Sequence, residues 1–404
     1  MDNEYAEIYK EHTLRSAFQP IISLPHRRAV GFEALIRASN ADDSIYSPEE
    51  LFSLPQSMSE RLILDRLCRK VHIHNFTRQN TSGEWLFLNL DSVSLSIEKP
   101  KPGFMTELLS IAGIPPHRIV IEILESKIDD KGYILEIIKH FREMGCLIAI
   151  DDFGAGHSNF DRIWELSPDI VKLDRSLIYR AALEPKIKRI LTGMISLIHE
   201  AGSLVIVEGI ETKQEALSAI ESNADMVQGF YFAMPNGSIN QEDAFADKID
   251  KLINDSEVQR KRDSNKLKYY LENLKNLFGQ CISNLQNNNS LSEAVLPIFN
   301  ASGVVRCFLL DEQGYQLGSN IHSVNYHENL KIGFSPLIQG DQKIQANWSH
   351  KHYHHRALTQ PDVINITRPY LSVAEAEMCV TVSKLVIIDQ QKFVLCCDLE
   401  WIEN

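Results

Sequence analysis

Long apolar runs are missing from the sequence. Hydrophobic residues make up 44% of its 404 residues, yet no stretch approaches the roughly 18 consecutive apolar residues that span a bilayer. The first twenty residues are polar and acidic and do not resemble a secretory signal. The sequence therefore predicts a chain without a membrane span, and we expect it to be cytoplasmic.

An excess of positive charge is also missing. The chain carries 41 Lys and Arg against 54 Asp and Glu, which gives a formal net charge of −13. Such a chain lacks the positive field that draws proteins to nucleic acids and to anionic membranes. We therefore expect no nucleic acid polymer among its partners.

The cysteines lack the spacing of a metal or redox motif. There are seven, none in a C-x-x-C pair, and Cys396 and Cys397 are adjacent. Adjacent cysteines seldom form an ordinary disulfide, and the count is odd. We expect reduced thiols, as in the cytoplasm.

Strand-like and helix-like segments alternate from about residue 15 to residue 237. Eight strand-like runs cover residues 18–24, 29–37, 85–91, 118–126, 147–154, 169–178, 204–212 and 225–233. Helical periodicity marks residues 60–74, 130–144 and 185–202 between them. This alternation predicts an α/β fold, a (β/α)8 barrel of the TIM type rather than an open sheet. Each run is apolar first and polar at its end, and the carboxyl ends of such strands build the active site of a barrel.

Residues 239–288 differ in composition, with no proline and one glycine. Apolar residues recur there at spacings of 4, 3, 4, 3 and 4, at Leu267, Leu271, Leu274, Phe278, Cys281 and Leu285. This heptad-like stripe predicts a long helix. It is equally typical of a helix that pairs with another helix and of a surface helix packed on its own domain.

The remaining residues, 289–404, contain two hairpin patterns, FLLDEQGYQLG and LVIIDQQKFVLCCDLEW, which predict a small α+β domain. We therefore divide the chain into a barrel at 1–238, a linker helix at 239–288 and a small domain at 289–404.

Polar residues stand at the ends of the predicted barrel strands. They are Glu33, Asn89, Glu122, Asp151, Asp152, Lys172, Glu208 and Gln228. Five carboxylates at one barrel mouth would repel one another unless cations bound between them. Oxygen ligands suit Mg²⁺ or Mn²⁺, and a pair of such ions can activate a water and stabilise a phosphoryl group during in-line displacement. The one lysine could orient or deprotonate that water, or neutralise developing phosphate charge.

Two plainer interpretations compete with a metal site. A single glutamate at a strand end is usually a solvated surface residue, and the segment DDFG is weak evidence because Asp-Phe-Gly also occurs in kinases. The sequence has no glycine-rich loop, upstream strand lysine or His-Arg-Asp segment, which excludes a kinase. The serial order of all these polar positions at successive strand ends favours one functional site.

Residues 15–237 resemble an EAL domain, the cyclic di-GMP phosphodiesterase family. The matching segments, which cover just over half of the chain, are FQPIISL, GFEALIR, LNL, IEILE, DDFGAGHSN, VKLD, VEGIET and QGFYFAMP. The family fold is a modified TIM barrel in which one strand runs antiparallel. The resemblance implies hydrolysis of one phosphodiester bond of cyclic di-GMP, giving linear pGpG, with two Mg²⁺ or Mn²⁺ ions. No GGDEF-like motif is present, so we do not expect synthesis of the nucleotide.

The resemblance also implies roles for single positions. The positions that match ligands of one metal are Glu33, Asn89, Glu122 and Asp151. Asp151 also matches the bridging ligand, with Asp152 completing the aspartate pair and Glu208 near the second metal.

Four kinds of position complete the implied site. Lys172 matches the lysine that contacts the catalytic water, and Gln228 matches a glutamine that helps to hold that water or the metal shell. Gln19 and Arg37 match positions that bind guanine and phosphate. Glu125 matches the glutamate that holds the loop after DDFG in place.

Every acidic ligand position is filled, which favours an active phosphodiesterase. The sequence departs from the family at His157, where Tyr is common, at Asn159, where Ser is common, and at Asp91, which replaces Ser. These departures affect the loop that couples to dimerisation. They keep open the alternative of a slow or inactive receptor that binds cyclic di-GMP and signals to a partner.

The last region resembles the YkuI-type C-terminal domain, a PAS- or Cache-like module. The segments that carry this resemblance are WSHKHYHHRAL, ITRPYLS and VLCCDLEW. It implies a regulatory domain, a homodimer and a small-molecule ligand, whose candidate contacts are Tyr353, Arg356, Tyr370 and Asp398. The plainer interpretation is that both tyrosines are core residues and that Asp398 caps a turn.

Histidines are concentrated between residues 322 and 355. His350, His352, His354 and His355 fall in one short stretch, which could form a transition-metal site. No cysteine or acidic partner stands at ligand spacing, so we favour exposed histidines on a loop or strand.

Overall fold

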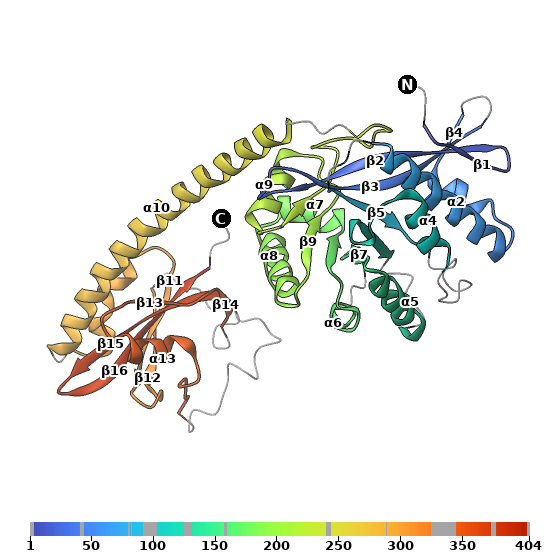
Figure 1. Cartoon of the computed structure of the whole chain (residues 1–404). Coiled ribbons are helices and arrows are strands. Elements are labelled where there is room, and N and C mark those ends of the chain that lie inside the picture. The colour runs from blue at the N-terminus through green and yellow to red at the C-terminus, as the bar shows by residue number, and fades with distance from the viewer. Residues whose placement is uncertain are drawn as a thin grey trace. The chain divides into compact units, whose positions relative to one another are not determined.

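The computed structural model describes residues 4–40, 44–79, 81, 83–91, 103–124, 131–156, 160–239, 244–287, 289–324, 345–372 and 377–401. The chain divides into two compact units, Met1–Gln259 and Arg260–Asn404 (Figure 1). Within the described residues, no helix is both long and apolar enough to cross a membrane.

The first unit contains a sheet of ten strands, eight of which close into a barrel. In spatial order the barrel strands are β2 (His12–Ser23), β10 (Met226–Val227), β9 (Leu204–Val207), β8 (Ile170–Leu173), β7 (Leu147–Phe153), β6 (Ile119–Leu124), β5 (Trp85–Asn89) and β3 (Arg28–Ser39). The pairing of β2 with β3 closes the ring, while β1 (Glu7–Tyr9) and β4 (Ile45–Tyr46) extend it at that point. The predicted barrel is confirmed.

Strand β2 runs antiparallel to both of its barrel neighbours, β3 and β10, whereas the other barrel pairs are parallel. The single antiparallel strand implied by the family resemblance is therefore confirmed. Because β2 and β3 form a hairpin, Gln19 on β2 lies directly opposite Glu33 on β3. The reversed strand thus presents its own polar residue at the level where the parallel strands present theirs.

Helices follow most barrel strands and cover the outside of the ring (Figure 1). Their bounds are α1 (Pro48–Ser53), α2 (Met58–Thr77), α4 (Phe104–Ala112), α5 (Lys131–Met144), α6 (Asp161–Leu166), α7 (Arg175–Leu183), α8 (Pro185–Glu200) and α9 (Lys213–Glu221). The main hydrophobic core lies between these helices and the outward face of the strands. The helical periodicities at 60–74, 130–144 and 185–202 correspond to α2, α5 and α8.

One strand prediction was half wrong. The sequence predicts a single strand-like run at 169–178, but β8 ends at Leu173 and α7 begins at Arg175. Asp174 accounts for the switch, because its side chain accepts a hydrogen bond from the backbone N–H of Ser176 and so caps the helix. The run 225–233 likewise contributes only two strand residues before the chain turns.

A small apolar layer fills the inside of the barrel. It consists of Ile21, Phe87, Val120, Ala149, Ile170, Ile206 and Met226. Gly31 occupies the corresponding place on β3, where a Cβ atom would lie 2.7 Å from the ring of Phe87. The layer closes one end of the barrel interior and leaves the next inward positions for polar side chains.

The second unit contains a six-stranded antiparallel sheet. Its strands are β11 (Val304–Asp311), β12 (Gln316–His322), β13 (Asn365–Ile366), β14 (Tyr370–Leu371), β15 (Met378–Ile388) and β16 (Gln391–Glu400), with the short helices α11 (Leu291–Ala294) and α13 (His352–Thr359). Both predicted hairpins are present. In the second, Asp389 and Gln390 have φ values of 49° and 67°, as a tight two-residue turn requires.

Helix α10 (Ala244–Gln286) contains the predicted apolar stripe. Leu274, Phe278, Cys281 and Leu285 are buried against residues of β11, β15 and β16. These four residues of the stripe therefore pack on the sheet of their own unit, as the second of the two interpretations predicts, whereas the side chain of Leu267 lies outside the described residues. The proposed division at 1–238, 239–288 and 289–404 stays a prediction. In the structure, the boundary between the two compact units falls inside α10, after Gln259.

Candidate active site

The polar side chains of the barrel form a second layer directly beyond the apolar one. On five parallel strands the polar residue follows the apolar residue by two positions, in the pairs Phe87 and Asn89, Val120 and Glu122, Ala149 and Asp151, Ile170 and Lys172, and Ile206 and Glu208. Because strand side chains alternate, both members of each pair face the barrel interior. The sequence pattern in which a polar residue follows an apolar one by two positions therefore places these polar side chains in one layer inside the barrel.

Lys172 lies at the centre of this layer and is almost fully buried. Its Nζ atom is 2.5 Å from both Glu122 Oε1 and Glu208 Oε1. It is also 3.1 Å from Asp151 Oδ1 and 3.7 Å from Glu33 Oε2. Four carboxylates thus converge on one ammonium group, three of them from β3, β6 and β7 and the fourth from Glu208, directly after β9.

The charges at this site strongly perturb one another. Burial raises the pKa of Glu122 and of Glu208 well above the usual range, and the neighbouring carboxylates raise both further. Burial alone would lower the pKa of Lys172, but Asp151, Glu122, Glu208 and Glu33 together outweigh it and raise that pKa well above normal. One positive charge cannot balance all these carboxylates, so the site favours additional cations.

Asp152 adds a carboxylate that regular strand geometry would direct outward. Its φ of 58° lies in the left-handed region, and the pairing of β7 with β8 shifts register between Ile150 and Phe153. Oxygen atoms of Asp151, Asp152 and Glu208 consequently all lie within 4.8 Å of one another. Such strain at a non-glycine residue is typical of functional sites. Burial, followed by the charge of Asp151, raises the pKa of Asp152.

Glu33 is held by two side-chain amides. Asn89 Nδ2 donates to Glu33 Oε1 at 3.0 Å, and Gln228 Nε2 donates to Glu33 Oε2 at 2.6 Å. Gln228 Nε2 also lies 3.2 Å from Gln19 Oε1. These contacts bring together four residues that the sequence placed in one site.

A cavity of about 230 Å³ opens beside these residues and is lined in part by Gln19, Glu33, Glu208 and Gln228. Sequence reasoning missed two charged residues of its wall, Arg175 and Glu211, which form an ion pair of 2.6 Å. Arg175 directly follows the segment VKLD and Glu211 lies within VEGIET, and this was the only sequence signal for them. Gly209 makes the wall compact, since a Cβ atom there would lie 2.5 Å from Arg175 Cβ.

The structure gives fewer contacts for the other predicted site residues. Arg37 lies four residues after Glu33 on β3, on the same side of the strand, and its guanidinium donates to the backbone oxygen of Ile36. Glu125, His157 and Asn159 lie outside the described residues. Asp91 accepts two hydrogen bonds from Arg61, at 2.7 and 2.9 Å.

The donor set fits divalent cations. Glu122 Oε2 and Gln228 Oε1 are buried, and neither has a hydrogen-bond partner within the described parts of the chain. A buried oxygen without a partner is costly unless something positive meets it. Carboxylate and amide oxygens are ligands that hard cations such as Mg²⁺, Mn²⁺ and Ca²⁺ accept.

The first unit is thus a closed α/β barrel with carboxylates grouped around a buried lysine. The sequence matches the EAL domain family over residues 3–235, more than half of the chain, and the chain belongs to that family.

Similar proteins agree with this assignment. The chain is 24% identical to the EAL-domain-containing protein YkuI of Bacillus subtilis over 83% of the chain and 82% of YkuI. It is 32% identical to the probable cyclic di-GMP phosphodiesterase PdeB of Escherichia coli over 49% of the chain and 38% of PdeB. It spans 31% of the signaling protein YkoW of Bacillus subtilis, so several relatives are far longer than their match.

Solved structures show the same fold. The crystal structure of Bacillus subtilis YkuI with cyclic di-GMP and calcium matches 96% of both chains, with a TM-score of 0.79 and 22% identity. The manganese and cyclic di-GMP complex of Klebsiella pneumoniae BlrP1 matches 57% of this chain and 58% of its own, with a TM-score of 0.52 and 25% identity. The first match extends over the C-terminal unit, whose PAS- or Cache-like type stays a prediction.

Three of the four candidate ligand contacts in the second unit lie near one another. Asp398 accepts from Thr381 Oγ1 at 2.6 Å, and Thr381 in turn contacts the hydroxyl of Tyr370 at 2.5 Å. Burial raises the pKa of Tyr353 and of Tyr370, with Asp398 contributing to both. Arg356 is exposed, and the cation beside Asp398 is instead Arg306, at 2.7 Å.

His350 lies in a turn, as expected, but the rest of the histidine-rich stretch is helical. It enters α13, and His354 is buried with its Nε2 atom 3.0 Å from the backbone oxygen of Asp311. The expectation of exposed histidines was therefore wrong for His354, because the helix turns that position toward the sheet. His350, His352 and His355 are exposed.

Proposed function

We propose that the barrel hydrolyses one phosphodiester bond of cyclic di-GMP to give linear pGpG, with two divalent cations, Mg²⁺ or Mn²⁺. The observation that carries this proposal is the convergence of Glu33, Glu122, Asp151 and Glu208 on Lys172 in a chain of the EAL family. Relatives described as cyclic di-GMP phosphodiesterases support the substrate. Structures of BlrP1 with cyclic di-GMP and manganese or calcium support both the nucleotide and the cations.

The carboxylates would hold the cations. Glu33, Asn89, Glu122 and Asp151 would provide one set of ligands, and Asp152 and Glu208 would extend it to a second ion. Bound divalent cations lower the pKa of water and stabilise negative charge on a phosphoryl group.

The remaining residues would position the reactants. Lys172, with its ammonium group inside the ring of carboxylates, would donate a hydrogen bond to the attacking water and keep it in line with the phosphorus atom. Gln228 keeps Glu33 in place through its 2.6 Å hydrogen bond. Gln19 and Arg37 would bind guanine and phosphate, and Glu125 would hold the loop after Phe153.

A second candidate is a receptor that binds cyclic di-GMP and cleaves it slowly or not at all. His157 and Asn159, which depart from the common residues of the family, are the features that favour it. The receptor would use the same pocket and would differ in turnover.

Purified full-length chain incubated with cyclic di-GMP in Mg²⁺ and in Mn²⁺, with nucleotide affinity measured in Ca²⁺, separates the two candidates. Formation of pGpG that chelation abolishes supports the enzyme. Tight binding in Ca²⁺ without turnover in either activating ion supports the receptor, and the absence of both contradicts the proposed function.

The roles of the other parts are also proposals. We infer that residues 289–404 regulate the barrel, that the chain forms a homodimer, and that the second unit takes a small molecule beside Asp398. The burial of Asp398, Thr381 and Tyr353 on one side of the sheet supports this last point.

A further inference from the structure

The loop that follows β10 touches the candidate site at two points. In this 228–236 loop, Gln228 donates to Glu33 at 2.6 Å, and the backbone oxygen of Ala233 accepts from Gln19 Nε2 at 3.4 Å. Both partners are inward-facing barrel residues, one on each strand of the β2–β3 hairpin. A displacement of this loop would therefore disturb Glu33 and Gln19 together.

On its inner side the loop rests on the backbone of Ile210. Tyr231 N donates to Ile210 O at 2.9 Å, and a Cβ atom at Gly229 would lie only 2.1 Å from that oxygen. Asn236 closes the loop by exchanging backbone hydrogen bonds of 3.0 and 2.8 Å with Phe18. The loop is thus fixed at its ends and along one side.

The outer side of the loop meets helix α10 at Lys248. The ammonium group of Lys248 donates a hydrogen bond to the backbone oxygen of Tyr231 and lies 4.0 Å from the centre of the Tyr231 ring. An ammonium above an aromatic face is attracted by its quadrupole. Lys248 is partly buried, and this burial lowers the pKa of its amine.

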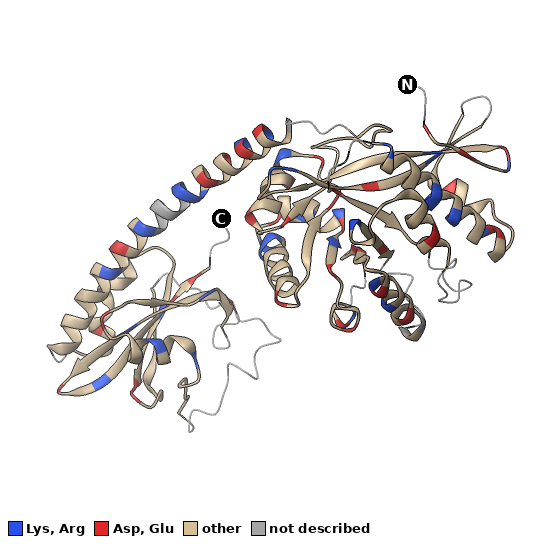
Figure 2. Cartoon of the chain, viewed as in Figure 1, with Lys and Arg blue, Asp and Glu red and all other residues tan. Residues whose placement is uncertain are grey.

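Lys248 is itself held in a fixed position. Phe245, Ile249 and Leu252 lie on one side of α10 and are buried in the barrel core. Arg27 donates to both carboxylate oxygens of Asp250, at 3.0 and 2.7 Å, and adds a polar anchor. Figure 2 shows both acidic and basic residues along α10.

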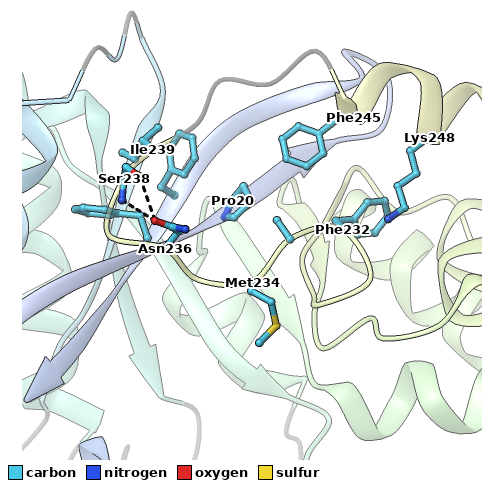
Figure 3. A pocket seen from close by; sticks show the side chains of 11 residues that line it. Pro20, Phe232, Met234, Asn236, Ser238, Ile239, Phe245 and Lys248 are labelled. Carbon is cyan, nitrogen blue, oxygen red and sulfur yellow. Dashed lines mark hydrogen bonds between the residues drawn. The ribbon is translucent and has the colours of Figure 1, made fainter. Parts of the chain in front are cut away.

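Open space lies against the loop beside Lys248. The cavity has a volume of about 350 Å³, and its lining includes Phe232 and Met234 of the loop together with Pro20 and Phe245 (Figure 3). Of helix α10, Phe245 and Lys248 line this cavity. The hydrogen bond from Lys248 thus meets the loop beside this open space.

We propose that Lys248 is a positioning residue, which holds the 228–236 loop and through it Gln228 and Gln19 in the arrangement that binds the nucleotide. The inference rests on the proposed function only where its test measures affinity for cyclic di-GMP. The first turns of α10 are thereby connected to the site through the 228–236 loop.

The test compares Lys248→Met, Lys248→Arg and the matched control Lys251→Met, an exposed lysine on the same helix, in the full chain. Amide hydrogen exchange of peptides covering residues 228–236 is measured without nucleotide. Affinity for cyclic di-GMP in Ca²⁺ and the melting temperature are measured alongside. We expect exchange in the loop to rise severalfold in Lys248→Met and affinity to fall about fivefold, with little change in melting temperature. Lys248→Arg should recover most of both effects, and Lys251→Met should match the wild type.

Loop exchange and affinity that are unchanged in Lys248→Met would overturn the inference. So would faster exchange across the whole barrel with a large drop in melting temperature, because Lys248 would then be a general stability residue. If the wild type itself does not bind cyclic di-GMP, the proposed function fails. The exchange data still decide the inference in that case, since faster exchange confined to the loop supports it.

Discussion

Lys172 Nζ and Glu122 Oε1 lie 2.5 Å apart at the centre of the barrel, and each residue exposes only 1% of its surface. The two residues come from β8 and β6, strands separated by β7 in the ring. A buried lysine among carboxylates is both a structural counter-ion and a donor to whatever binds between them.

Replacing Lys172 with Met keeps most of the side-chain volume and removes the charge. We expect turnover of cyclic di-GMP to fall by about 10²-fold or more, while affinity in Ca²⁺ changes little, because the ammonium acts on the water rather than on the bound nucleotide. Lys186→Met, at an exposed position of α8, is the control for kinetics and affinity. An unchanged rate in Lys172→Met would remove this residue from the mechanism.

Glu33→Ala should abolish hydrolysis in Mg²⁺ and in Mn²⁺. The change removes a metal ligand and also leaves the amides of Asn89 and Gln228 without their common acceptor. Product formation measured by chromatography, with the exposed Glu11→Ala as control, tests this. Substantial residual turnover would contradict the ligand role of Glu33.

Divalent cations should stabilise the barrel against heat. An ion that binds only the folded state adds about 2.7 kcal/mol at a hundred times its Kd, which raises the melting temperature by about 5 °C or more. Thermal unfolding with and without Mn²⁺ measures the effect. Asp151→Asn should lose most of it, whereas Asp247→Asn, exposed on α10, should keep it. Equal Mn²⁺ effects in the two variants would argue against a cation at Asp151.

His72 should make the first unit less stable in mild acid. Burial, with a smaller contribution from the charge of Arg37, lowers the pKa of His72 from 6.5 to about 3. Below pH 6.5, His72 therefore binds a proton in the unfolded chain but stays neutral in the folded chain. The stability that this histidine contributes is present above pH 6.5 and is lost as the pH falls.

Between pH 6.5 and 5 the loss amounts to about 2 kcal/mol of unfolding free energy. Urea unfolding at both pH values, for the wild type and for His72→Gln, measures it. The variant gives up the 2.9 Å contact between His72 Nδ1 and Ser16 Oγ but should show a smaller difference between the two pH values. Equal differences in both proteins would show that His72 is not responsible.

Leu274→Ala should destabilise the second unit by about 2–4 kcal/mol, because Leu274 is 1% exposed and packs in the core of that unit. Tyr269→Ala, on the same helix with 79% of its surface exposed, should have little effect. Chemical denaturation measures stability, and sedimentation velocity measures association. A dimer that dissociates in Leu274→Ala while stability is unchanged would restore the idea that this stripe pairs with another helix.

Much of the barrel could be predicted because the sequence patterns that specify it lie within single strands and helices. The pairs Val120 and Glu122, and Ile170 and Lys172, show the two-residue step from apolar to polar that points both side chains inward. The boundary at Asp174 was missed because a helix cap and a strand end use the same polar residue types.

The sequence by itself determined the barrel, its EAL membership and the set of polar residues that meet in it, since periodicity and short motifs encode them. Only the tertiary structure decided which of these groups touch and which faces are covered. It placed Lys172 among four carboxylates, paired Asp398 with Arg306, and buried Leu274 on the sheet of its own unit. These contacts join residues from different strands and helices. Their distances depend on how the chain closes and packs, which no local pattern records.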